Sequence, residues 1–254
     1  MTSWLREMDS VLRGKKGDPQ LLAQGMGHIR LGPLVGGCLL LGIIYGLFMG
    51  LYAVLTRTPP SFEQLAASAV KVPAVFLLTL VVTFPSLYVF SALLGVQLGP
   101  KDTLRLMMVP VAVNLTVLAS LGPITGFFTL NTTSYHFMKL LNVFFFTVSG
   151  VIGLKVLLTM LRRLEAAQAP PYVGVPVQTP EGGELPKLPP EPPRPSARKT
   201  FRVWLIIYAL VGAQMGWVLR PFIGAPNLPF ELFRAREANI FIDIIRTIGE
   251  LFSK

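Results

Sequence analysis

Long apolar runs alternate with short polar segments along the whole chain. Windows of about 19 residues, the length that crosses a hydrocarbon core near 30 Å, select five runs. These runs cover residues 31–55, 72–94, 106–128, 137–158 and 203–222. The pattern predicts an all-α fold, namely a polytopic membrane helix bundle with five transmembrane helices and amphipathic helices at its surface.

Two further segments have helical periodicity but are too polar to cross a membrane. Near the N-terminus, apolar residues recur between charged ones at Trp4, Leu5, Met8, Val11 and Leu12. A short surface helix is predicted there, with a frayed polar tail as the alternative. Residues 236–253 place seven apolar residues in one arc of a helical wheel: Ile240, Phe241, Ile244, Ile245, Ile248, Leu251 and Phe252. This helix suits a membrane surface or a groove in a partner protein, and its nearly balanced charges favour the partner.

The predicted spans divide the chain into five parts. These are an N-terminal cytoplasmic segment, a four-span bundle, a proline-rich cytoplasmic linker, a fifth span and an external C-terminal part, covering residues 1–30, 31–161, 162–201, 202–223 and 224–254. The linker region 166–200 contains ten prolines and no apolar periodicity. Such a segment is extended and partly polyproline II, so a semi-rigid spacer is favoured over a docking strand.

Composition and charge place the chain in a membrane. Hydrophobic residues make up 52% of the chain and charged residues only 14%, too few to cover a soluble protein of this length. The net charge of +10 is attributed to basic residues that flank the apolar runs and orient the chain in the membrane, so nucleic acid is not a predicted partner. The N-terminal segment and the loops after the second and fourth runs carry 14 Lys and Arg residues, against four that lie close to the spans on the other side. The N-terminus is therefore predicted in the cytoplasm and the C-terminus outside it.

The first apolar run carries a row of glycines. On a helical wheel, one arc of about 120° contains Gly32, Gly36, Gly42, Gly46 and Gly50. Small residues spaced in this way let another helix approach closely within a bilayer. The predicted occupant is a helix of the same chain, with a second copy, another subunit, a flat tetrapyrrole or a lipid as alternatives.

Candidate chemistry within the spans is sparse. None of the 13 acidic residues falls in a predicted span, and the single cysteine, Cys38, excludes a thiolate cluster. His28 and His136 are predicted on opposite sides of the membrane. Neutral polar residues, above all Asn114 and Gln214, mark faces turned toward protein. Arg220, with Trp217 one turn earlier, fits an interface anchor, and no cofactor or metal is predicted.

Two stretches carry a family resemblance: VPAVFLLTLVVTFPSLYVFSALLG at 72–95 and VGAQMGWVLRPFIGAPNLPF at 211–230. They resemble a group of uncharacterised bacterial inner-membrane proteins with five spans. The five-span plan with a cytosolic N-terminus is similar in outline to Yip1-like proteins, although only about thirty residues precede the first span here. The resemblance implies a bacterial inner membrane and carries over no site residue.

These observations predict a non-enzymatic protein. The leading hypothesis is an accessory or scaffold subunit of a larger bacterial inner-membrane complex. Its partners would be the lipid bilayer and other membrane subunits or further copies of itself, held by helix packing, the linker and the C-terminal helix. The alternatives are a small channel or carrier for a neutral or small solute, and a pigment- or haem-associated subunit.

Overall fold

The computed structural model describes residues 3–18, 21, 26–93, 99–168, 197–220, 222–224, 230–233 and 240–252. Within these ranges the chain forms seven α-helices and no strand. The helices are α1 (Ser3–Leu12), α3 (Leu31–Thr56), α4 (Phe62–Leu93), α5 (Pro100–Asn131), α6 (Tyr135–Gln168), α7 (Ala197–Val218) and α8 (Ile240–Phe252). Of the predicted linker, residues 162–168 belong to the end of α6 and residues 197–201 to the start of α7, whereas residues 169–196 lie outside the described ranges.

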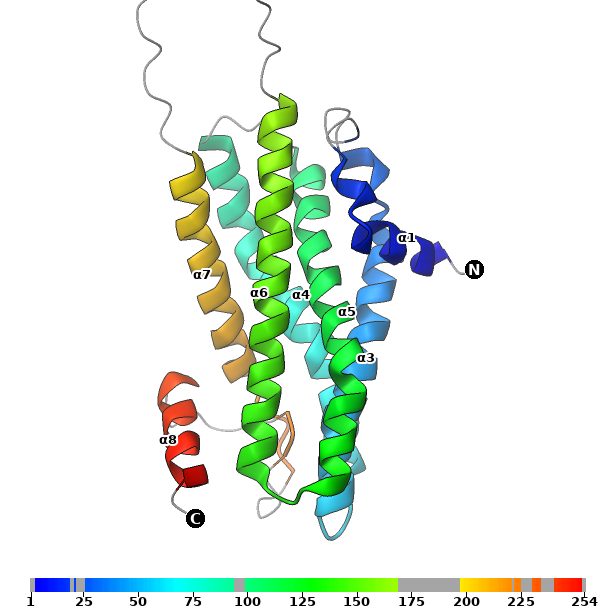
Figure 1. The fold of residues 1–254 in the computed structure, drawn as a ribbon, viewed down its shortest axis with the longest axis vertical. Coiled ribbons are helices and arrows are strands. Elements are labelled where there is room, and N and C mark those ends of the chain that lie inside the picture. The colour runs from blue at the N-terminus through cyan, green and yellow to red at the C-terminus, as the bar shows by residue number, and fades with distance from the viewer. Residues whose placement is uncertain are drawn as a thin grey trace, which may run out of the picture.

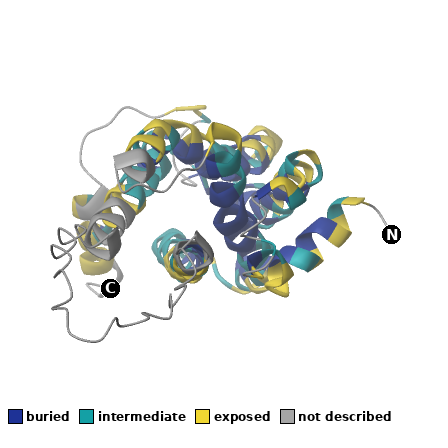
Figure 2. Ribbon diagram, turned by 90° about the horizontal axis from the view of Figure 1, so that it is seen from above, coloured by how far each residue is buried: buried dark blue, intermediate teal, exposed yellow. Residues whose placement is uncertain are grey.

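Four of these helices are long and apolar enough to cross a membrane. They contain the stretches Leu31–Thr56, Phe62–Val89, Pro100–Asn131 and Tyr135–Arg163, so four of the predicted runs are confirmed as long apolar helices of sufficient length to span a membrane. The four helices run up and down beside one another, with α3 packed on α4 and α5, and α6 packed on α5 (Figure 1). Seen from above, the buried residues gather on the N-terminal side of the bundle, whereas its C-terminal side is mostly intermediate or exposed (Figure 2).

The second span begins earlier than the apolar pattern indicated. Its helix, α4, starts at Phe62, ten residues before the predicted run. Lys71, which was predicted in the loop outside this span, therefore lies within the helix and is only 4% exposed. Its ammonium donates to the backbone oxygen of Leu232 and lies over the ring of Phe233, 5.3 Å from the centroid. These contacts shield the charge, so Lys71 does not end the span, and the boundary predicted at residue 72 was too late.

The lower part of the α3 glycine row is filled by α4. A Cβ built on Gly46 would lie 2.5 Å from the backbone oxygen of Ser68, and one on Gly50 would lie 2.8 Å from the Cα of Leu65. Gly42 meets Pro73 in the same way, at 2.7 Å. The helices approach so closely because no side chain stands between their backbones. This stretch of the row thus has an occupant from the same chain.

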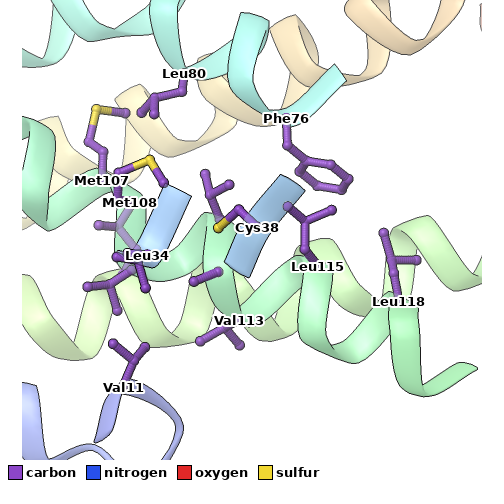
Figure 3. Close-up of a cluster of buried hydrophobic side chains, with 14 of the residues drawn as sticks. Val11, Leu34, Cys38, Phe76, Leu80, Met107, Met108, Val113, Leu115 and Leu118 are labelled. Atoms are coloured by element: carbon purple, nitrogen blue, oxygen red, sulfur yellow. The ribbon is translucent and has the colours of Figure 1, made fainter. Parts of the chain in front are cut away.

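Sulfur-containing and branched side chains fill the centre of the bundle. Cys38 and Leu34 of α3 point toward Met107, Met108 and Leu115 of α5, and all five side chains are buried (Figure 3). Two tyrosines of α3 tie this core to the next helices. Tyr45 donates to Asn142 Oδ1 of α6 at 2.8 Å, and Tyr52 donates to the backbone oxygen of Thr133 at 2.6 Å. Buried hydrogen bonds of this kind fix which helix faces meet.

The N-terminal segment packs on the bundle. Met8 of α1 is buried and lies 3.0 Å from where a Cβ of Gly37 would be. Glu7 forms an ion pair with Lys16 at 3.0 Å and accepts from the backbone N–H of Arg30. Arg163, near the C-terminal end of α6, donates to the backbone oxygen of Gly17 at 2.9 Å. These contacts replace the alternative of a frayed tail with a segment held against α3 and α6.

The fifth apolar run forms a helix that stops before the run does. The α7 helix packs on α4 and ends at Val218, four residues before the predicted boundary at 222. Beyond it, the backbone oxygen of Phe222 accepts hydrogen bonds from Gln64 Nε2, at 2.7 Å, and from Ser68 Oγ. Gly224 takes the left-handed conformation with φ of 77° against the side chain of Gln64. The chain after α7 therefore folds back against α4.

The C-terminal helix turns its polar side toward the bundle. Lys139 of α6 forms an ion pair with Asp243 and donates to Thr247 Oγ1 at 2.9 Å, and His136 lies 2.9 Å from Glu250. The other side of α8 exposes apolar residues, with Ile245 70% exposed. This exposed arc is the face that the sequence assigns to a membrane surface or a partner protein, and that assignment stays a prediction.

Candidate functional site

A cavity of about 530 Å³ lies between α6 and α7. Its floor is formed by α4 and α5, through residues such as Thr79 and Asn114, and its lower end by α8. The cavity exists because α7 packs on α4 while α6 packs on α5, so these two helices frame a space instead of filling it. Its volume lies within the range of ordinary small-molecule pockets, roughly 300–1,000 Å³.

Glycines on both walls keep the cavity open. Gly150 of α6 and Gly216 of α7 line it, and a Cβ on either would have no atom within 4 Å. Gly153 of α6 also lines it, and the Asn114 side chain occupies the place where its Cβ would be, with Oδ1 only 1.8 Å away. The spacing of Gly212 and Gly216 is the same four-residue pattern as in the first apolar run. Side chains at Gly150 or Gly216 would take up free space, whereas one at Gly153 would displace Asn114.

The lining contains buried polar atoms without a partner among the described residues, in particular Asn114 Oδ1, an acceptor, and Trp217 Nε1, a donor. Asn114 is 4% exposed and Trp217 is 7% exposed. A buried group without a hydrogen bond costs about 1–3 kcal/mol, so a molecule that supplies the missing partner would gain binding energy here.

Charged residues gather at the lower end of the cavity. The Arg220 guanidinium lies over the ring of Trp217, 3.8 Å from its centroid. Lys139 and Asp243, the ion pair between α6 and α8, belong to the same lining. The remaining walls are mostly aromatic and aliphatic, so the cavity has a charged end and a long apolar part.

The predicted site residues separate into three groups. Asn114, Trp217 and Arg220 come together in this cavity, so the pair predicted as an interface anchor lies within the protein. Gln214 is a partly buried residue of α7 outside the lining. Gly32 and Gly36 lie beyond the reach of α4, with nothing within 4 Å of a Cβ.

The residues of the predicted partner helix are only partly described. Ile244 lines the cavity, and Ile245 and Ile248 are exposed. The side chains of Ile240, Phe241, Leu251 and Phe252 lie outside the described part of the chain.

Sequence reasoning missed Gly150, Gly153, Gly216 and Lys139 as site residues. The Gly212 and Gly216 pair offered a signal, because glycines four apart in an apolar helix mark a close approach or an open space. Lys139 offered none, since its partner Asp243 is more than one hundred residues away.

Within the described ranges, no group of three or more His, Cys, Asp or Glu side chains is placed to hold a metal ion. Comparison of the chain with family models, curated proteins and solved structures returns no match. The resemblance to bacterial five-span and Yip1-like proteins therefore stays a prediction.

Proposed function

We propose that this chain is a non-enzymatic integral membrane protein that binds a molecule from the bilayer in the cavity between α6 and α7. The observation that carries the proposal is the pair of buried, unpartnered polar atoms on Asn114 and Trp217 in an otherwise apolar lining. A few polar groups placed in an apolar cavity are the usual composition of a ligand site.

The other polar groups of the lining support binding more than catalysis. Asn142 accepts from Tyr45, and Lys139 is held by Asp243 and Thr247. These groups already serve to join helices. A catalytic site would need an acid, base or nucleophile poised toward the reacting atoms, and the described lining offers its single carboxylate, Asp243, in an ion pair.

The same proposal includes five crossings in a bacterial inner membrane, the last of them discontinuous. The whole of α7, 22 residues, is ~33 Å long, but its apolar part, residues 203–218, extends only ~24 Å at 1.5 Å per residue, short of a core about 30 Å thick. The α8 helix lies below the end of α7 and beside α6 (Figure 1). Together, α7 and α8 would complete the crossing, with the N-terminus in the cytoplasm and the C-terminus outside. Irregular backbone at membrane depth is tolerated where it lines a cavity, as it would here.

This topology predicts that the two chain ends are labelled from opposite sides. Because Cys38 is the only cysteine, a Cys38→Ala background allows single cysteines at Ser3 and Ser253. A membrane-impermeant maleimide should label Ser253→Cys in intact cells and Ser3→Cys only in inverted vesicles. Labelling of both positions from one side would rule out an odd number of crossings.

Filling the cavity tests the binding function. Gly150→Leu and Gly216→Leu should fold normally, because their side chains enter free space. Native mass spectrometry of the protein extracted in mild detergent should show a bound molecule that both variants lose. Gly36→Leu is the matched control, since its side chain is also unhindered but points away from the cavity lining. If the wild type carries no bound molecule and neither cavity variant differs from it, the proposal is wrong.

An accessory subunit of a larger complex is a second candidate. The observation that favours it is the uncovered end of the glycine row, Gly32 and Gly36, which lies near exposed Leu39 and Leu40. A helix from another subunit or a second copy could pack there as α4 packs lower down. In the same preparations, a protein partner that is retained by wild type and lost on Gly36→Leu would establish this role.

A further inference from the structure

We propose that the cavity holds one acyl chain of an anionic phospholipid, with the phosphate placed at the charged end beside Trp217, Arg220 and Lys139. This inference rests on the proposed binding function and names its ligand. It is argued from the shape of the cavity, its opening and the donors at its lower end.

The cavity is long and slender. On α6 its apolar lining runs from Val143 to Leu157, and on α7 from Tyr208 to Gly216. The α6 stretch alone is ~21 Å long at 1.5 Å per residue, more than the roughly 15 Å that one leaflet of a hydrocarbon core provides. A volume of about 530 Å³ spread over such a length leaves a narrow section. An extended hydrocarbon chain fits this shape better than a compact or broad ligand.

The cavity opens toward the lipid. Val151 of α6 lines it and is 47% exposed, and Ala209 of α7 is another exposed residue of the lining. Exposed apolar residues flank this opening, including Ile152 on α6 and Leu210 on α7. A lipid of the surrounding bilayer could therefore insert one chain sideways between α6 and α7 without crossing a polar surface.

Hydrogen-bond donors converge at the lower end. Trp217 Nε1 is a buried donor without a partner among the described residues. Lys139 uses two of the three hydrogens of its ammonium on Asp243 and Thr247, which leaves one. Arg220, stacked on Trp217, brings a planar guanidinium of the kind that binds phosphate in a bidentate manner.

Charge complementarity selects an acidic headgroup. The charged residues of the lining are Lys139, Arg220 and Asp243, two cations and one anion. A phosphodiester supplies acceptors for the Trp217 N–H and the remaining Lys139 hydrogen, and its charge is opposite to that of the two cations. The charged end lies near the turn between α5 and α6, opposite the end where α6 finishes and α7 begins, which the predicted topology assigns to the cytoplasm, so the lipid would belong to the outer leaflet (Figure 1).

The test uses the full-length protein reconstituted in vesicles of phosphatidylcholine with a minor fraction of phosphatidylglycerol. After extraction in mild detergent, native mass spectrometry should show one phosphatidylglycerol retained in preference to phosphatidylcholine. Trp217→Phe keeps the aromatic ring for Arg220 and removes only the N–H. It should lower this preference about tenfold, the usual effect of losing a hydrogen bond to a charged group.

Two variants separate the possible outcomes. Gly150→Leu should abolish retention of either lipid, because its side chain fills the space assigned to the acyl chain. Arg220→Gln should reduce the preference for phosphatidylglycerol while one phosphatidylcholine is still retained.

Equal retention of the two lipids by the wild type overturns the headgroup assignment and leaves the binding function intact. Retention of phosphatidylglycerol by Gly150→Leu overturns the acyl-chain assignment in the same limited way. A wild-type protein without any bound molecule, together with an unchanged Gly150→Leu, overturns the binding function itself.

Discussion

Replacing Gly46 by leucine will prevent α3 from packing against α4. A Cβ on Gly46 lies 2.5 Å from the backbone oxygen of Ser68 and 2.6 Å from the Cα of Ala69, so the clash is with backbone and no rotamer change relieves it. The two helices must separate along their whole contact. We expect a loss of about 3 kcal/mol or more, at the upper end of overpacking penalties. In detergent, this should appear as a sharp fall in thermal stability measured by size-exclusion chromatography.

The control for this experiment is Gly36→Leu on the same helix. Its added side chain meets nothing within 4 Å, and leucine is the better helix former. The thermal midpoint of Gly36→Leu should therefore stay within a few degrees of wild type. Equal destabilisation by both substitutions would mean that α3 is sensitive to leucine as such, and the close contact of α3 and α4 would be refuted.

Replacing Lys139 by methionine will detach α8 from α6. The Lys139 and Asp243 side chains are only 23% and 21% exposed, and Lys139 also binds Thr247. Methionine leaves the Asp243 carboxylate unpaired beside apolar surface. Breaking such a pair is costly mainly because of the charge left behind, here about 2 kcal/mol after allowing for its partial exposure. The free energy of docking of α8 should fall by this amount.

A double substitution shows whether the pair is responsible. Lys139→Met combined with Asp243→Leu removes both charges and should recover much of the docking that Lys139→Met loses. The docking is reported by the accessibility of a cysteine at Ile244, placed in the Cys38→Ala background. Ile244 belongs to α8 and lines the cavity, so it is covered while α8 is docked. The cysteine should react faster in Lys139→Met than in the double variant. Identical rates in all variants would contradict a holding role for the pair.

The fold was predictable from the sequence where local composition determines it. Four spans follow from the length and apolarity of their runs. A hydrocarbon core offers no hydrogen bonds to the backbone, so a run that crosses it must be helical even where it is rich in glycine. The start of α4 was missed by ten residues, because the Lys71 ammonium is held by the backbone oxygen of Leu232 and the ring of Phe233, from a distant part of the chain. Similarly, the end of α7 at Val218 reflects Gln64 and Ser68 binding the segment after it.

The cavity could be anticipated only in fragments. Asn114 was singled out as a polar residue within a span, and Trp217 and Arg220 as a pair one turn apart. Their joint location depends on the separation of α6 and α7, which is set by the helices on which each one packs. No periodicity within one helix encodes that distance. The inward polar side of α8 was likewise missed, because its partners Lys139 and His136 belong to another helix.

The short reach of α7 also bears on how the chain is synthesised. During translation, the residues of α8 are still inside or near the ribosome when α7 reaches the insertion machinery. If the two helices share one crossing, α7 must wait in the translocon, or leave it partly inserted, until α8 has left the ribosome. A premature stop codon just before Ile240 would then leave the preceding part of the polypeptide stranded within the bilayer and open to quality-control proteases.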